Sequence, residues 1–225
     1  MLGANGPTGR RVVRLALERG HAVTASTRQP GAFPLQHARL RVAGGDATDP
    51  GVARDALEDC DAVISVIGSA YTRRPVTVYS RAASAVVGAM RESGCRRLLA
   101  VTSSGVTPLA QRDDLSVPGR AFHRLARRTF GRTVYDDMER MEAVVSDSPV
   151  DWTIVRPPGL TDEPGTGYAI AEDVVEGPYC SRDDLAAVLL DQLDDDRYRR
   201  RVAAVSTPGL HVGALTTFRR EMLKR

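Results

Sequence analysis

Three glycines near the start of the chain restrict its fold more than any other feature. They form the pattern GxxGxxG at Gly3, Gly6 and Gly9, and an amphipathic segment, RRVVRLALERG, follows directly. Such a pattern is typical of a strand that turns sharply into a helix whose free N–H groups face a phosphate. Gly3 would permit the turn, Gly6 would leave room for the phosphates, and Gly9 would let the helix pack closely on the strand. The motif therefore predicts a diphosphate site of the kind that binds a dinucleotide.

Short apolar stretches alternate with amphipathic segments along the rest of the chain. Strands are expected at residues 21–26, 39–45, 62–68, 97–104, 151–157 and 201–206. Helices are expected at residues 8–19, 50–58 and 76–92, twice between 119 and 145, and at 182–193. Apolar strands without polar alternation are typical of a parallel sheet covered on both faces. The pattern predicts an α/β fold, a Rossmann-type doubly wound parallel sheet with helices on both faces, as a single domain over residues 1–225.

The strand that should precede the glycine turn is unexpectedly short. Only Met1 and Leu2 stand before Gly3. In this fold the first strand is central and has about five residues. Two explanations stay open: the natural chain begins earlier, or this strand is unusually short and anchors the turn less firmly.

The composition narrows the classes of function. Hydrophobic residues make up 42% of the 225 residues and charged residues 26%, which is ordinary for a globular protein. No apolar run approaches the roughly 20 residues of a membrane span, and no signal sequence stands at the start, so we expect a cytoplasmic protein with no membrane partner. The net charge is +3, with Lys224 as the single lysine beside many arginines. These arginines are scattered among acidic residues without interleaved aromatic side chains, which disfavours nucleic-acid binding.

The cysteines indicate neither a disulfide framework nor a metal site. Cys60, Cys95 and Cys180 are odd in number and far apart, with no CxxC pair and no histidine cluster beside them. Reduced, mostly buried thiols are expected, and no bound metal.

The end of the expected strand 21–26 indicates which nicotinamide dinucleotide would bind. A site that prefers NAD usually places Asp or Glu there, and no acidic residue occurs from Arg19 to Gly45. Ser26, Thr27 and Arg28 would instead offer hydroxyl groups and a guanidinium to the 2′-phosphate, so NADP (NADPH) is expected. Asp46, directly after the expected strand 39–45, is placed to meet the adenine. A solvated loop arginine at Arg28 and a turn residue at Asp46 remain the alternatives.

The motifs taken together resemble those of a known family. They are GANGPTGR, STR, GGDATD, SVIG, VTSSGV, YDDMERMEAVV and DWTIVRPPGLTD. The chain resembles the atypical short-chain dehydrogenase/reductases, and within them the NAD(P)H-binding, NmrA-like group that includes the biliverdin-IXβ (flavin) reductases. The similarity runs from Gly3 to about Pro208. The glycine motif is shared by the whole superfamily, whereas the last two motifs are more specific to this branch.

The resemblance implies a binding role for each motif. Those expected to hold the pyrophosphate are Gly3, Asn5, Gly6, Thr8 and Gly9. Arg28 would bind the 2′-phosphate and Asp46 would lie beside the adenine. The residues expected around the nicotinamide are Ser65 to Gly68 beneath its ribose, Ser103 facing the ring, and Arg156, Pro157 and Pro158 in a loop that closes over it.

The proton donor that is usual in this superfamily is missing. Its better-known members use a tyrosine whose pKa is lowered by a lysine four residues later. Here Tyr135 is followed at that spacing by Glu139, and a nearby carboxylate raises a tyrosine pKa. The better-supported interpretation of Tyr135 is a helix residue that packs on strand 97–104, and with Ser103 it is retained as a catalytic candidate.

Hydride transfer by positioning is the chemistry that remains. An acceptor that stabilises its own charge, such as a flavin, quinone or conjugated tetrapyrrole, could take its proton from water, whereas a plain ketone would need a better acid. Further candidates to bind or protonate the acceptor are Ser104, Met138, Met141 and His123, although methionines at this spacing are more often core residues.

The function expected is an NADPH-dependent oxidoreductase that reduces a small aromatic or conjugated acceptor, or a ketone, without a Tyr/Lys pair. Residues 105–132 and 157–181 are expected to cover the substrate and select it. A catalytically silent NADP sensor and an isomerase or lyase on the same fold remain as alternatives. The expected partner is a small-molecule substrate, and the protein is expected to be a monomer or homodimer.

Overall fold

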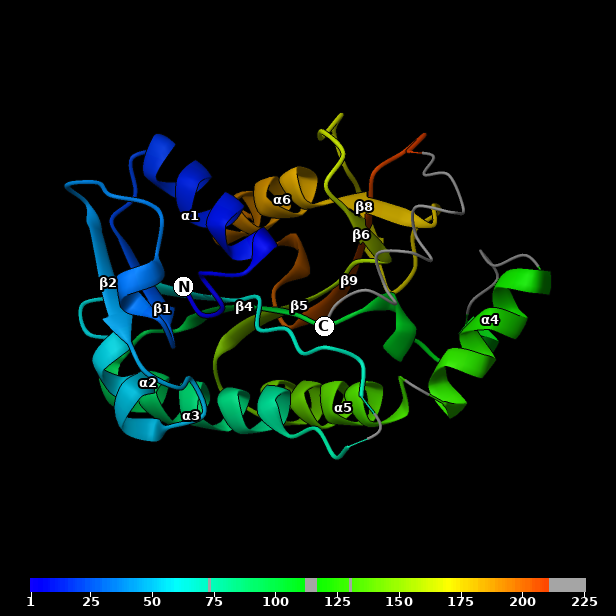
Figure 1. The fold of residues 1–225 in the computed structure, drawn as a ribbon, viewed down its shortest axis with the longest axis horizontal. Coiled ribbons are helices and arrows are strands. Elements are labelled where there is room, and N and C mark those ends of the chain that lie inside the picture. The colour runs from blue at the N-terminus through cyan, green and yellow to red at the C-terminus, as the bar shows by residue number, and fades with distance from the viewer. Residues whose placement is uncertain (73, 112–116, 130, 211–225) are drawn as a thin grey trace.

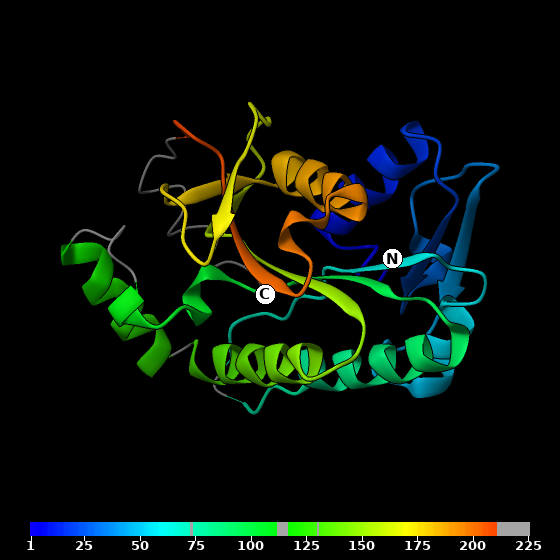
Figure 2. The ribbon, with the colours of Figure 1, turned by 180° about the vertical axis from the view of Figure 1, so that it is seen from behind.

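The computed structural model in Figure 1 has three layers, a central sheet between two layers of helices. It describes residues 1–72, 74–111, 117–129 and 131–210. One face of the sheet is covered by α1 (Pro7–Glu18) and α6 (Arg182–Asp194), and the other by α2 (Pro50–Ala56), α3 (Val78–Ser93) and α5 (Arg132–Ser146), as Figure 2 shows from behind. This arrangement confirms the expected doubly wound fold.

The sheet is mainly parallel. Its strands are β1 (Val23–Thr27), β2 (Leu40–Gly44), β3 (Ala62–Ser65), β4 (Arg97–Val101), β5 (Asp151–Arg156), β7 (Ala169–Glu172) and β9 (Arg201–Ser206). On one side β1 pairs with β2, and on the other the strands follow the order β3-β4-β5-β9-β7. A separate parallel pair is formed by β6 (Gly159–Thr161) and β8 (Tyr179–Ser181). The other elements are α4 (Val117–Arg128) and the short 3-10 helices Pro30–Ala32, Ser104–Val106, Leu109–Gln111 and Asp196–Tyr198.

A single residue occupies the place of the missing central strand. Leu2 bridges in parallel to Ser26 of β1 and to Ser65 of β3, and so joins the two parts of the sheet. Its N–H donates to the Ile64 carbonyl at 2.9 Å, and its own carbonyl accepts from Val66 N at 3.1 Å. At 1% exposure Leu2 is fully buried. The residues directly before Gly3 are thus bridged to strands on both sides.

One edge of the sheet differs from the sequence prediction. The expected sheet was wholly parallel, but β7 pairs with β9 in the antiparallel direction. Residues 157–181, expected only as a substrate-covering segment, supply β6, β7 and β8. Strands of three or four residues are too short to show a periodic pattern, and an antiparallel edge strand is common on a parallel sheet.

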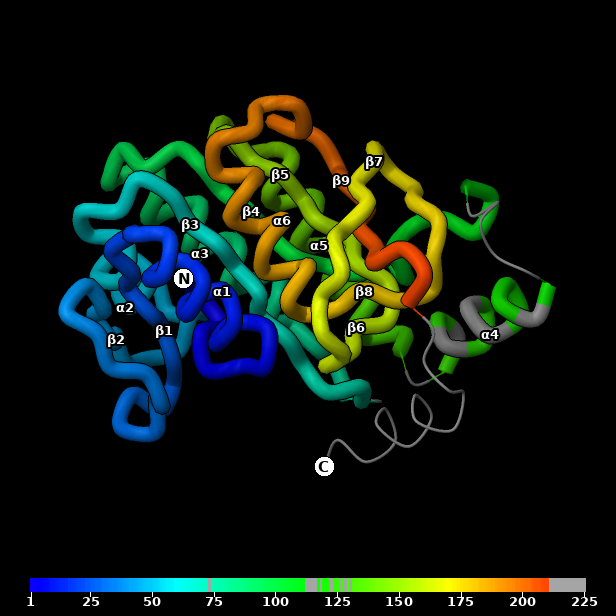
Figure 3. The backbone as a smooth tube through the Cα atoms, turned by 90° about the horizontal axis from the view of Figure 1, so that it is seen from above, coloured from blue at the N-terminus to red at the C-terminus, as the bar shows by residue number. Residues whose placement is uncertain are grey.

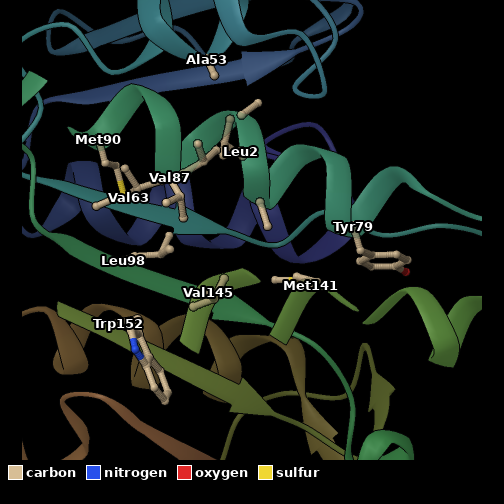
Figure 4. Packing of buried hydrophobic residues seen from close by; sticks show 14 of the residues in the cluster. Leu2, Ala53, Val63, Tyr79, Val87, Met90, Leu98, Met141, Val145 and Trp152 are labelled. Carbon is tan, nitrogen blue, oxygen red and sulfur yellow. The ribbon is translucent and has the colours of Figure 1, made fainter. Parts of the chain in front are cut away.

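The core lies on both faces of the sheet. Figure 4 shows the cluster beneath α3 and α5, where Leu2, Val63 and Leu98 of the sheet meet Met90 and Met141 of the helices. Met138 belongs to the same cluster, so both methionines are core residues, the more common of the two interpretations. Figure 3 shows α1 and α6 side by side over the opposite face.

The three cysteines are free thiols, as expected. Cys95 and Cys180 are buried and Cys60 is half-buried. Burial raises the pKa of Cys95 to about 11 and that of Cys180 to about 12, so both remain protonated and unreactive at neutral pH.

A buried carboxylate on α5 holds the start of α3. Asp137 has no exposed surface and accepts hydrogen bonds from Tyr79 N at 2.9 Å and Ser80 Oγ at 2.5 Å, and it pairs with Arg140 at 3.2 Å. It therefore does the work of an N-terminal cap from a different helix, at a point where α3 has no side-chain cap of its own.

Removal of this carboxylate should destabilise the protein. We expect Asp137→Ala to lower the free energy of unfolding by about 2 kcal/mol, because buried donors at the start of α3 lose their acceptor. Urea denaturation followed by circular dichroism measures the change. The matched control is Asp136→Ala, whose side chain is 44% exposed and pairs only at 3.8 Å with Arg132. Equal stabilities for the two variants would contradict the capping role of Asp137.

Candidate functional site

The glycine turn has the geometry that a diphosphate needs. Gly3 has a φ of +73°, which L residues rarely adopt, and a Cβ on it would lie 2.8 Å from the Val66 carbonyl oxygen. A Cβ on Gly9 would overlap the Gly3 carbonyl oxygen and lie 2.7 Å from that of Ala4. Gly3 and Gly9 thus have the roles expected from the sequence, the sharp turn and the close packing of α1.

The start of α1 is open to a ligand. Gly6 is the N-cap, and among the described residues no side chain caps this helix. The first N–H groups of a helix lack intrahelical partners and lie at the positive end of its dipole, so they suit an anion. Thr8 and Gly9 are buried in this first turn. The uncapped first turn of α1, directly after the tight turn that Gly3 and Gly9 permit, fits the diphosphate of a dinucleotide.

An arginine that sequence reasoning missed lies at the same turn. Arg10 donates to Asn5 Oδ1 from Nε at 3.0 Å and from Nη2 at 2.8 Å, and its side chain is exposed. The amide of Asn5 therefore holds a guanidinium beside the helix start. The sequence did carry a signal for this arginine. Arg10 directly follows Gly9, the last glycine of the motif, and a cation there complements the charge of a diphosphate.

The ends of β1 and β2 bring Arg28 and Asp46 together. Thr48 N donates to Asp46 Oδ1 at 2.9 Å, and this bond is the main cause that lowers the pKa of Asp46. The positive charges of Arg28 and Arg81 lower it further, so both guanidinium groups act on the same carboxylate. Arg81, on α3, lines a groove with Thr48 and was not anticipated from the sequence.

The two hydroxyl groups expected beside Arg28 are not offered to solvent. Ser26 is 2% exposed, with Oγ buried, because it lies against Leu2 in the sheet. Thr27 is buried as well and its Oγ1 accepts from Gln29 N at 3.2 Å. Arg28 alone is exposed in this motif, so a contact with the 2′-phosphate would come from its guanidinium.

The end of β3 and the residues that follow it lie against the glycine turn. Ser65 is buried and pairs with Leu2, and the Val66 carbonyl faces Gly3. Gly68 is exposed, and no described atom lies within 4 Å of the position of its Cβ. The position beside Gly68 is therefore open, at the end of the segment where the resemblance would place a nicotinamide ribose.

The loops after β4 and β5 are joined at the same end of the sheet. Ser103 Oγ accepts from Gly105 N at 3.1 Å, and Ser104 N donates to the Pro157 carbonyl at 2.8 Å. Ser103 is half-buried and Pro157 is buried. In this bond the Ser103 hydroxyl group is the acceptor, so its hydrogen can still be donated toward a ligand.

Arg156, at the end of β5, is held by a partner on α5. Its guanidinium pairs with Glu142 of α5 at 2.6 Å, and Thr102 Oγ1 donates to the same carboxylate at 2.6 Å. Both ionic side chains are almost buried, at 11% and 12% exposure. Arg156 therefore fastens β5 to α5, and the expectation that the loop of Arg156, Pro157 and Pro158 closes over the nicotinamide stays a prediction. The sequence could not show this because Glu142 lies on a separate helix.

Tyr135 is buried against the loop that follows β4. A Cβ on Gly105 would overlap its ring, 2.7 Å from Cζ and 2.9 Å from the hydroxyl oxygen. Tyr135 is therefore a packing residue, as expected, and its ring lies against the 3-10 helix Ser104–Val106 that follows β4. Its hydroxyl group nevertheless lies beside Gly105, the residue whose N–H binds Ser103. Tyr135 can therefore pack in the core and still place its hydroxyl group near the candidate site.

Three groups surround the Tyr135 ring. Its hydroxyl oxygen lies 3.0 Å from that of Tyr71, and the Arg127 guanidinium lies 5.7 Å from the ring centroid. Arg127 also donates to the Gly105 carbonyl at 2.8 Å and forms an ion pair with Glu139. The nearby Tyr79 hydroxyl accepts from Ser69 N at 2.8 Å, and burial raises the pKa of Tyr79 to about 12.

The remaining points concern His123, metal sites and membrane spans. Nothing is described of the His123 side chain. Within the described residues no group of three or more His, Cys, Asp or Glu could hold a metal ion. Among the helices of those residues, none combines the length and hydropathy of a membrane span.

The fold and the site together define a class. A glycine turn at the point where a doubly wound sheet reverses its strand order is the dinucleotide site of Rossmann-type NAD(P)-binding proteins. The chain belongs to the NAD(P)H-binding family of atypical short-chain dehydrogenase/reductases, and the NAD(P)H-binding family model matches residues 3–196. The family assignment thus confirms the resemblance to the NAD(P)H-binding atypical short-chain dehydrogenase/reductases.

Known proteins agree with this assignment over nearly the whole chain. A Bacillus subtilis protein named as an uncharacterized sugar epimerase, YhfK, is 28% identical over 89% of this chain and 90% of its own. A short-chain dehydrogenase/reductase from Veillonella parvula, solved in complex with NADP, has a TM-score of 0.76 at 20% identity, over 94% of each chain. ChuY from Escherichia coli O157:H7, named as an Anaerobillin reductase, has a TM-score of 0.72 at 25% identity, over 94% of this chain and 98% of its own.

Proposed function

We propose that the protein is an NADPH-dependent reductase of a small aromatic or conjugated acceptor. The observation that carries the proposal is the tight glycine turn at Gly3–Gly9, with Arg28 exposed directly after the neighbouring strand β1. NADP bound to the Veillonella parvula protein and the reductase name of ChuY support it as likenesses.

The residues have separate tasks in this proposal. Bound NADPH supplies a hydride from its nicotinamide ring. The first turn of α1 and Arg10 hold the diphosphate, Arg28 holds the 2′-phosphate, and Asp46 lies beside the adenine. Ser103 donates a hydrogen bond at the nicotinamide end and so orients the acceptor.

The acceptor class is proposed from the demand that each acceptor makes on a proton donor. A flavin, quinone or tetrapyrrole delocalises the charge that hydride transfer creates, so it makes a smaller demand on the proton donor than an isolated ketone does. We further propose that the segments 105–132 and 157–181 select the acceptor, since they border the ends of β4 and β5. With α4 they include a helix that projects from the body of the molecule in Figure 1.

Binding and turnover test the proposal separately. Calorimetry with NADPH and NADH measures binding, and steady-state NADPH oxidation is followed with FMN, a quinone, biliverdin and cyclohexanone. We expect turnover with at least one conjugated acceptor and none with cyclohexanone. Binding without turnover of any acceptor would contradict the reductase and favour an NADP sensor, or the isomerase chemistry suggested by the name of the Bacillus relative. Absence of binding would contradict the site itself.

A further inference from the structure

The charge that the missing lysine would supply comes from another helix. In this chain the position four residues after Tyr135 is Glu139, and Glu139 forms an ion pair with Arg127 of α4. That guanidinium lies 5.7 Å from the centroid of the Tyr135 ring. A cation over an aromatic ring stabilises the electron-rich phenolate more than the neutral phenol. The carboxylate at position 139 thus brings a positive charge to Tyr135.

Arg127 is fixed from several directions. Besides Glu139, it contacts the carbonyl oxygens of Gly105 at 2.8 Å and Val106 at 3.3 Å. These carbonyls belong to the 3-10 helix that Ser103 caps. The guanidinium therefore connects α4, α5 and the loop after β4, and its place relative to Tyr135 depends on all three.

A second tyrosine, which is partly exposed, is hydrogen-bonded to Tyr135. Tyr71 comes from the segment after β3, is 39% exposed and places its hydroxyl oxygen 3.0 Å from that of the buried Tyr135. The two rings are tilted by 57° with centroids 6.0 Å apart, so they meet mainly through their hydroxyl ends. Either hydroxyl can donate in this bond, which is what the passage of a proton requires.

We propose that Tyr135 protonates the acceptor, that Arg127 takes the part of the missing lysine, and that Tyr71 returns a proton to Tyr135 from solvent. This inference rests on the proposed reductase function. The acceptor gains one hydride and then one proton from the Tyr135 hydroxyl. The phenolate left on Tyr135 takes the Tyr71 hydroxyl proton, and Tyr71 takes a proton from water, so the net source is one solvent proton. Glu139 is a positioning residue that acts through Arg127.

The first test follows ionisation without any turnover. The charged and titratable groups that face Tyr135 are Arg127 of α4, Glu139 of α5, Tyr71 and Tyr79. The ¹³Cζ NMR signals of the six tyrosines are titrated in the cofactor-free protein, with Tyr135 assigned by Tyr135→Phe. We expect Arg127→Gln to move the Tyr135 midpoint to higher pH, and Arg127→Lys to restore most of it. The control Arg124→Gln removes an exposed charge from the same helix and should leave the midpoint unchanged. An unchanged midpoint in Arg127→Gln would overturn the role of Arg127.

The second test measures catalysis with an acceptor that the wild-type protein reduces. We expect Tyr135→Phe to lower kcat about 100-fold with little change in KM, as is usual for loss of a general acid. Tyr71→Phe should lower kcat about 10-fold and leave NADPH affinity unchanged. The control Tyr168→Phe removes a hydroxyl that binds Asp191 between α6 and the edge of the sheet, and should keep wild-type kcat.

The outcomes separate the two proposals. If the wild-type protein reduces an acceptor and Tyr135→Phe does so equally well, the proton comes from elsewhere and the relay is wrong, while the reductase function stands. If the wild-type protein reduces no acceptor, the reductase function and the relay fail together. If Tyr135→Phe lowers kcat but Arg127→Gln leaves the Tyr135 midpoint unchanged, Tyr135 is still the proton donor. The role of Arg127 in activating it is then wrong.

Discussion

Gly9→Val is expected to destabilise the protein by about 3 kcal/mol and to abolish NADPH binding. A side chain at this position would overlap the Gly3 carbonyl oxygen, which belongs to the turn and cannot move without displacing Leu2 from the sheet. The start of α1 would have to shift away, and its free N–H groups would no longer converge on the diphosphate.

Thermal unfolding and calorimetry measure the two effects of this substitution. For a domain of this size, 3 kcal/mol corresponds to a fall of roughly 6–12 °C in Tm. The matched control is Gly88→Ala, in the middle of α3, where no described atom lies within 4 Å of the new Cβ. Alanine favours helix more than glycine, so the control should keep or slightly raise Tm. A Gly9→Val protein with wild-type Tm and NADPH affinity would contradict the close packing at the glycine turn.

Arg28→Glu is expected to weaken NADPH binding about 100-fold and to leave NADH binding within about 3-fold of the wild type. The substitution exchanges a guanidinium for a carboxylate at the proposed place of the 2′-phosphate, and a 100-fold loss corresponds to about 2.7 kcal/mol. Asp46 would add to the repulsion, because Arg28 no longer offsets its charge. The exposed position of Arg28 makes a folding defect a small concern.

Calorimetric titration of both nucleotides at several salt concentrations measures this change. The control Arg91→Glu makes the same change in net charge at an exposed position near the end of α3 and should leave both affinities unchanged. Equal losses for NADPH and NADH in Arg28→Glu would contradict the phosphate contact. In that case Arg10 and Arg81, the other arginines near the proposed site, become the candidates for charge reversal.

Several features could be predicted because they depend on neighbours in the sequence. The strong amphipathic pattern of residues 7–18 predicts a helix, and Val12, Val13 and Leu17 are buried in α1. The apolar runs around β4 and β5 predict strands that are buried on both faces, and both proved central. Glycine at positions 3 and 9 is a steric requirement of the local turn, so the dinucleotide site could be recognised from spacing alone.

Other features depend on partners that are distant in the chain. The charge on Arg156 would suit a ligand as well as an ion pair, and only the packing of α5 on β5 shows that it pairs with Glu142. Ser26 has a polar side chain in a promising motif, yet the central position of Leu2 buries it. Neither outcome leaves a periodic or local trace in the sequence.

By itself the sequence determined the class of fold, the glycine turn and the family, because strand and helix periods and the backbone conformation at a glycine depend on residues close together in the chain. Only the tertiary structure decided what surrounds Tyr135. Tyr71 stands 64 residues before it, and the cation on its ring comes from a separate helix. A missing lysine four residues away was visible in the sequence. Its replacement by an arginine was not, since that depends on how α4 and α5 pack against the loop after β4.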